Sequence, residues 1–196
     1  MPLTTLSELK LQLGIPDNEN DDDFFLQQAL DAAEIEVISQ MNREVAEATF
    51  TEYASGRGGE SLNLRQGPLV SVTTVDFVTY GGGGSESLTT IDKGNFVLHG
   101  KRDEGWKLRG RLVGHNAWTW DRGARNYKVV YVAGWTAIPK DIKQAIFNLA
   151  AWIIQKRKDP AAVQREVGDG TVQFRFSGDK LFQVRSTIGP YLDIGF

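Results

Sequence analysis

Carboxylates alternate along an acidic run near the start of the chain, between Asp17 and Asp23. Alternating oxygen ligands are typical of a calcium loop, but that loop needs a Gly at its sixth position and a Glu at its twelfth. Counted from Asp17, those positions hold Asp22 and Gln28. We therefore interpret the run as the acidic start of a helix, where carboxylates complement the positive end of the helix dipole.

Nucleophilic and metal-binding residue types are scarce. The chain has no cysteine, which excludes disulfides, thiolate metal sites and cysteine nucleophiles. Its two histidines, His99 and His115, stand alone, without the close H-x-H or H-x-x-x-H spacing of many zinc sites. No G-x-S-x-G motif positions a nucleophilic serine. We expect no catalytic residue, no metal and no cofactor.

Glycines cluster at Gly56–Gly59 and at Gly81–Gly84, two places where a phosphate could be bound. Neither cluster continues as G-x-x-x-x-G-K-[ST], and neither is a G-x-G-x-x-G turn that opens a helix. We interpret both as connections between strands.

Tryptophan and arginine are interleaved in the middle of the chain. Such a mixture binds single-stranded nucleic acid or sugars in some proteins and forms subunit interfaces in others. The formal net charge is −3, whereas a protein that grips DNA normally has a basic face. We favour packing and interface roles and expect only weak binding of duplex DNA. The residues are Trp106, Trp118, Trp120 and Trp135, with Arg109, Arg111, Arg122 and Arg125.

Helical periodicity appears first near the start of the chain. Thr5 and Glu8 form a T-x-x-E capping box, which predicts a short helix over residues 5–13 that Gly14 ends. A second helix is expected over 22–42, where apolar and small residues recur at spacings of three and four. We predict that one face of it contacts a neighbouring subunit, with packing inside the chain as the alternative. That face consists of Leu26, Ala29, Leu30, Ala33 and Val37.

Residues 44–136 contain most of the glycines and several short alternating runs, which predict roughly six strands in a small barrel or sandwich. Pro139 then suits the first turn of another helix. The expected fold class is α+β: a small helical bundle, residues 1–43 with 137–196, that carries the β-rich module as an insert.

The last stretch of the chain is apolar for a terminus. We predict a docking arm that inserts against a partner protein or a neighbouring subunit, and folding back onto the chain's own helices is the alternative. The arm residues are Leu181, Phe182, Val184, Ile188, Tyr191, Leu192, Ile194 and Phe196. No apolar run approaches the roughly 20 residues of a membrane helix, and the first residues lack the features of a signal peptide. We expect neither membrane contact nor export.

Both ends carry motifs of one known family. Leu3–Lys10, Leu13–Ile15 and Asp22–Leu26 resemble the opening of the head–tail connector (neck adaptor) proteins of long-tailed bacteriophages. Val129–Trp135, followed by Ile138–Pro139, is similar to the return of larger members into their helical part. The motifs touch about half of the chain. The family would be expected to end in a basic segment, but this chain ends in Asp-Ile-Gly-Phe.

The resemblance implies a structural protein of the virion, located at the head–tail junction and present in the host cytoplasm during assembly. It implies a dodecameric ring beneath the portal protein, which extends the DNA channel and offers a platform to the next neck or tail-terminator protein. DNA would pass through the channel without tight binding. Two alternatives stay open: a tail-completion or stopper protein of the same neck, and a β-domain module that binds carbohydrate or nucleic acid.

Overall fold

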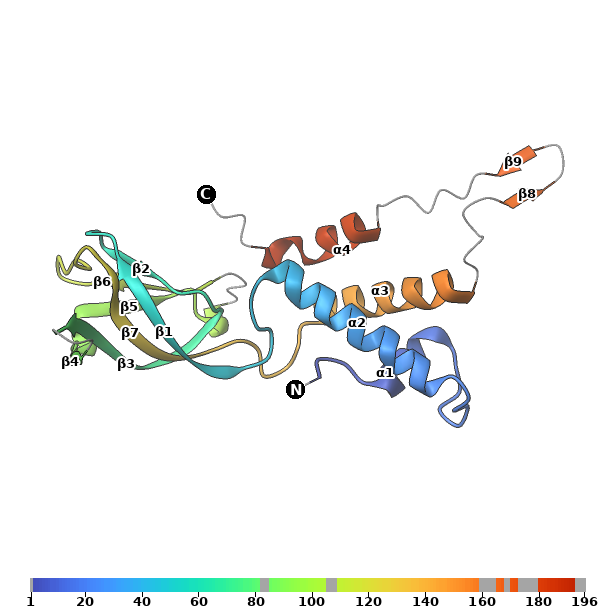
Figure 1. Ribbon diagram of the computed structural model, residues 1–196, viewed down its shortest axis with the longest axis horizontal. Helices are drawn as coiled ribbons and strands as arrows, with labels where there is room; N and C mark the ends of the chain where they lie inside the picture. Colours follow the sequence, from blue (N-terminus) through green and yellow to red (C-terminus); the bar gives the residue numbers. More distant parts are fainter. Residues whose placement is uncertain are drawn as a thin grey trace. The chain divides into compact units, whose positions relative to one another are not determined.

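The computed structural model divides the chain into two compact units, a helical unit up to Asn42 and from Ile138 to Leu192, and a β unit from Arg43 to Ala137 (Figure 1). Helices and antiparallel sheets occur together, which confirms the expected α+β class. The residues described are 2–81, 85–104, 109–158, 165–167, 170–172 and 180–192.

The helical unit is built on two long helices, α2 and α3, that pack against each other (Figure 1). The shorter α1 contacts both, and α4 packs mainly on α3. The bounds are α1 Leu6–Leu13, α2 Asp23–Met41, α3 Lys140–Lys158 and α4 Lys180–Ile188, followed by the 3-10 turn η4 Gly189–Tyr191. Between α3 and α4 in the sequence, β8 Arg165–Val167 and β9 Gly170–Val172 pair as a two-stranded antiparallel hairpin.

The capping box is present at the start of α1. The backbone N–H of Glu8 donates to Thr5 Oγ1 at 3.3 Å, and the backbone N–H of Thr5 donates to Glu8 Oε2 at 3.0 Å. Gly14 ends the helix with a φ of 71°, a left-handed conformation that glycine adopts readily. The first two helix predictions, over 5–13 and 22–42, are confirmed to within one residue at each end.

The β unit contains two antiparallel sheets. One has the order β1-β7-β3-β4 and the other β2-β6-β5. The strands are β1 Ala48–Gly56, β2 Ser61–Asn63, β3 Leu69–Tyr80, β4 Glu86–Thr90, β5 Phe96–His99, β6 Arg111–Gly114 and β7 Gly123–Ala133. Two 3-10 turns, η2 Lys93–Asn95 and η3 Arg102–Glu104, flank β5.

Both sheets contribute to one apolar core. On β7, Tyr127, Val129 and Tyr131 occupy every second position and are at most 1% exposed, as a strand with one buried face requires. Trp120 is fully buried, and its ring meets that of Tyr127 edge to face with centroids 5.1 Å apart. This geometry favours the attraction between the positive ring edge and the negative ring face.

One strand expectation was partly wrong. The sequence fits a strand over Trp106–Leu112, but β6 begins only at Arg111 and runs to Gly114. Gly110 is instead in a connection, where its N–H donates to the Gln66 carbonyl at 3.2 Å and its α-carbon lies against Leu69. Together with the 3.0 Å hydrogen bond from the Leu64 N–H to the Gly110 carbonyl, these contacts hold the connection to the segment that follows β2. Residues 105–108 lie outside the described residues.

Candidate assembly surfaces

The α2 face that we expected at a subunit contact is buried inside the chain's own helical unit. Its five residues are at most 2% exposed, because α2 lays this face on α3 and α1. Packing within the chain accounts for their burial, so a subunit contact through them stays a prediction. The residues are Leu26, Ala29, Leu30, Ala33 and Val37.

Part of the predicted docking arm is folded back on the helices. Val184, Ile188 and Tyr191 are buried, with exposed fractions of 4%, 0% and 2%. The Tyr191 hydroxyl donates to the Asp141 carboxylate of α3, with oxygen–oxygen distances of 2.6 and 2.7 Å. These contacts, together with a 2.8 Å hydrogen bond from Arg185 Nε to Gln40 Oε1, fasten α4 to α3 and α2.

The other arm residues have no described packing, apart from Leu192, which is partly buried. The side chains of Leu181 and Phe182, and the whole of Ile194 and Phe196, lie outside the described residues. A docking role for the arm therefore stays a prediction, and Ile194 and Phe196 are the arm residues beyond the buried helix and turn.

The opposite face of α2 carries large apolar side chains in contact with solvent. Phe24 is 79% exposed and Ile35 is 69% exposed, and they alternate with small and polar residues. We call this set the α2 outer face. Its residues, all exposed, are Phe24, Gln28, Asp31, Ala32, Ile35 and Ser39. Sequence reasoning missed it, because α2 is apolar on both sides and only one stripe was followed.

The tryptophans of the middle region do not form one cluster. Trp120 is buried in the β core and donates its indole N–H to the Glu60 carbonyl at 3.0 Å. Trp135 is 9% exposed, with the Arg43 guanidinium 5.5 Å from its ring centroid. Trp106 lies outside the described residues. Trp120 and Trp135 are thus packed within the β unit, which is the role that we favoured for them.

Trp118 belongs to a cavity of about 410 Å³ on the β unit. Three aromatic rings, from Phe77, Trp118 and Tyr127, share its lining with the carboxylates of Asp92 and Asp121. The indole nitrogen of Trp118 is buried without a hydrogen-bond acceptor among the described residues. Aromatic walls with a few polar groups are typical of sites for small polar molecules.

In the β unit, the pKa values of Tyr131 and Glu47 are shifted, and both groups hydrogen-bond to residues that come from distant parts of the sequence. Burial, followed by the neighbouring Glu52, raises the pKa of Tyr131, whose hydroxyl donates to Glu52 Oε2 at 2.7 Å. Hydrogen bonds from Thr136 and then Arg102 lower the pKa of Glu47. Each carboxylate links segments that are distant in the sequence: Glu52 accepts from Tyr131, and Glu47 accepts from Arg102 and Thr136.

The described part of the chain brings together no three His, Cys, Asp or Glu side chains in a geometry that could hold a metal ion. His99 is on β5, and His115 follows β6, where its backbone N–H donates to the Asn95 carbonyl at 2.8 Å. Among the described helices, none combines the length and the apolar character needed to cross a bilayer.

No protein-family model and no curated protein matches the sequence. Solved structures do match. A chain from the neck of an empty GTA particle, computed with C6 symmetry, aligns with a TM-score of 0.60 at 20% identity, over 99% of this chain and 91% of that one. A chain from the virion of a native gene transfer agent (GTA) particle aligns with a TM-score of 0.58, at the same identity and coverage.

A chain from the neck of a native GTA particle, computed with C12 symmetry, gives a TM-score of 0.54 at 19% identity, over 97% of this chain and 89% of that one. These alignments include both the helical and the β unit. The chain therefore shares its fold, over nearly its whole length, with chains of gene transfer agent particles, among them chains of the neck.

Proposed function

We propose that this protein is a head–tail connector in the neck of a tailed phage or a phage-like particle. The observation that carries the proposal is the structural match to a chain of the GTA neck over 99% of this chain and 91% of the other. A match confined to a β sandwich would be weak support, because that architecture serves many functions. Here a discontinuous helical unit and its insert match together.

The proposed assembly is a ring of identical copies, most simply a dodecamer, below the portal protein. The neck structures that this chain resembles were computed with C6 and C12 symmetry. Closed cyclic symmetry arises when each copy uses the same two surfaces to contact its neighbours. The ring would be part of the virion at the head–tail junction, after assembly in the host cytoplasm.

In this role the protein binds and spaces other components, and it makes and breaks no bond. The ring would extend the DNA channel and offer a platform to the next neck or tail-terminator protein. The net charge of −3 suits a channel that lets DNA slide, because a strongly basic wall would hold the phosphates. The proposal needs no cofactor.

Negative-stain microscopy of the purified protein, mixed with the portal protein of the same particle, tests this function. We expect rings stacked coaxially on portal rings. Binding only to isolated tails would instead support the tail-completion alternative. A protein that joins neither portal nor tail would exclude a role in the neck.

A second candidate function uses the β-unit cavity. Its three aromatic rings, its two carboxylates and the unsatisfied Trp118 indole favour a module that binds carbohydrate. Glycan-array binding by the wild-type protein, lost in Trp118→Ala, would support this candidate. Equal, background-level signals from both proteins would reject it.

A further inference from the structure

We propose that neighbouring copies in the ring meet head to tail through two faces of the helical unit. The α2 outer face of one copy contacts the outer face of α3 in the next. This inference rests on the proposed ring. The sequence predicted a subunit contact through the stripe of α2 that is buried in the chain, and we now place the contact on the exposed α2 outer face.

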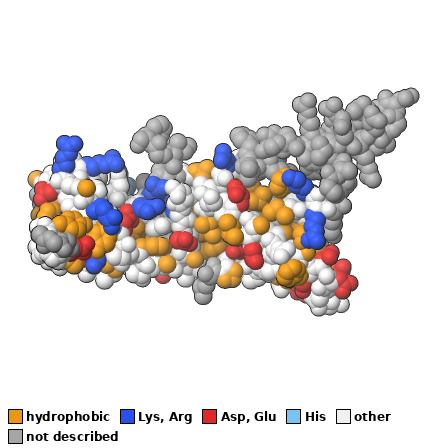
Figure 2. Space-filling view, viewed as in Figure 1, with side chains coloured by type: hydrophobic (Ala, Val, Ile, Leu, Met, Phe, Trp, Pro, Cys, Tyr) orange, Lys and Arg blue, Asp and Glu red, His pale blue; other side chains and the backbone are white. Residues whose placement is uncertain are grey.

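The α2 outer face has the composition of an interface that is open in the single chain. Phe24 and Ile35 are large and mostly exposed, while Ala32 and Ser39 between and beyond them are small. Small residues let a second helix approach closely, and the large ones then fill its grooves. Figure 2 shows hydrophobic side chains exposed among acidic ones over α2.

The outer face of α3 is mainly polar, with one aromatic residue. Lys140 and Asn148 are exposed, and Trp152 is partly exposed, with the Lys156 ammonium 5.0 Å from its ring centroid. Tryptophan is among the residues that most often anchor protein interfaces. We call this set the α3 outer face. Its residues are Lys140, Gln144, Asn148, Ala151, Trp152 and Gln155.

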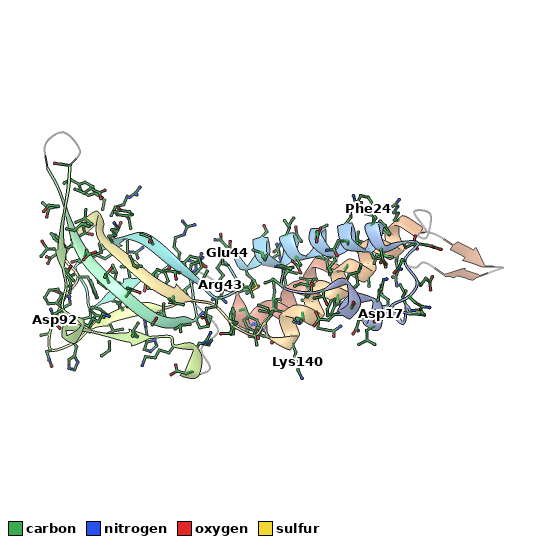
Figure 3. All side chains as sticks on the ribbon, turned by 90° about the horizontal axis from the view of Figure 1, so that it is seen from below. Asp17, Phe24, Arg43, Glu44, Asp92 and Lys140 are labelled. Atoms are coloured by element: carbon green, nitrogen blue, oxygen red, sulfur yellow. The ribbon has the colours of Figure 1, made fainter. Side chains whose placement is uncertain are left out.

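The two outer faces lie on opposite sides of the helical unit. Phe24 and Lys140 point away from each other at opposite edges in Figure 3. The helix period gives the same result, because the buried residues of α2, such as Ala33, point toward α3, while Ile35 points away. A head-to-tail ring needs two different surfaces on each copy, and opposite sides let the chain of copies continue.

Charge complementarity makes the second copy the occupant of the α2 outer face. The α2 outer face has one charged residue, the acidic Asp31. The α3 outer face has one charged residue, Lys140, and the exposed Lys156 lies beside its Trp152. Contact between two α2 faces would bring like charges together, whereas contact of α2 with α3 brings opposite charges together.

Cysteine cross-linking tests the contact, because the natural chain has no cysteine to give a background. Particles are assembled with a chain that carries both Ile35→Cys and Asn148→Cys, and are then treated with a short bismaleimide. We expect a ladder of covalent oligomers from the double variant. We expect no covalent dimer from either single variant, since each copy then has a cysteine on only one of the two faces.

The control replaces Leu11, which is 81% exposed on α1, in place of Ile35. Leu11→Cys combined with Asn148→Cys should give far less oligomer. Equal ladders from the two pairs, or dimers from Ile35→Cys alone, would overturn the head-to-tail contact. Absence of any ring of the unsubstituted protein on the portal would instead overturn the proposed function, so the two failures are distinguishable.

Discussion

Lys10 shows how a single charged residue organises the acidic start of the chain. Its side chain is buried within α1, yet Nζ lies 2.5 Å from Asp23 Oδ1 and donates to the Glu19 carbonyl at 2.8 Å. A buried ammonium is tolerated only when it is paired and hydrogen-bonded. The acidic run, which sequence alone offered as a possible cation loop, is therefore wrapped around a lysine of the same chain.

The ion pair between Glu8 and Lys143 gives a prediction about pH. Oε1 of Glu8 lies 2.7 Å from Lys143 Nζ, and this hydrogen bond is the main cause that lowers the pKa of Glu8 below 4.5. A lowered folded-state pKa means that the contribution to stability is present above about pH 4.5 and is lost as the pH falls through the folded-state pKa. Since Glu8 is 40% exposed, we expect Glu8→Gln to cost less than about 1 kcal/mol at pH 7.

Urea unfolding of wild type and Glu8→Gln at pH 7 and pH 3 measures the effect. Gln can still accept the Thr5 N–H in the capping box, so the change removes chiefly the charge. The difference between the two proteins should shrink at pH 3. Exposed Glu60, changed to Gln, should show no such pH-dependent difference. A gap that persists unchanged at pH 3 would contradict the assignment to the ion pair.

At the scale of elements, the β unit depends on close approaches between connections and strands. Gly110 lies so near β3 that a Cβ atom there would be 2.1 Å from Leu69 Cγ. Leu69 is fully buried, so it has little room to move away. Overlaps of this kind force side chains and backbone out of their preferred positions.

We predict that Gly110→Ala destabilises the protein by about 1–3 kcal/mol. Gly59→Ala is the matched control, because nothing lies within 4 Å of the added methyl group. Its effect should stay within about 0.5 kcal/mol. Equilibrium unfolding followed by tryptophan fluorescence compares the two, and equal stability of both variants would show that the Gly110 contact is not tight.

At the scale of the whole molecule, the helical unit consists of two segments of the chain, and the β unit is inserted between them in the sequence. In the helical unit, α4 is held by Tyr191 and Asp141, and Ile188 is fully buried. Cutting the chain before α4 would expose the surface of α3 that α4 covers. A test of docking must therefore leave α4 intact.

Deleting residues 193–196 provides that test. The truncated protein should keep the wild-type unfolding midpoint, because Val184, Ile188 and Tyr191 remain. If Ile194 and Phe196 dock on the portal or on a neighbouring subunit, heads that carry the truncated protein should fail to join tails in a particle-reconstitution assay. The full-length variant with Ile194→Ser and Phe196→Ser separates the loss of side chains from the loss of chain length. Normal particle yield from both variants would reject docking by the chain end.

The amino-acid sequence by itself determined the local structure. The Thr5–Glu8 capping box and Gly14 place the ends of α1, because the signals act within one helical turn. In the sequence, the alternation of apolar residues slips by one position between Val72 and Val75, which predicts a bulge or a bend, and β3 has a register shift between Val72 and Thr74. Alternation and helical period sufficed for the α+β class, since each depends only on neighbouring residues.

Tertiary structure alone decided which surfaces remain open. The helical period of α2 marked the stripe with Ala33 as a contact face, but it could not tell whether a neighbouring subunit or the same chain covers that stripe. That choice is made by α3, which lies more than 90 residues later in the chain and covers one side. The strand order β1-β7-β3-β4 is likewise non-local. Burial depends on which distant element covers a face, and the residue period of a single helix or strand does not identify that element.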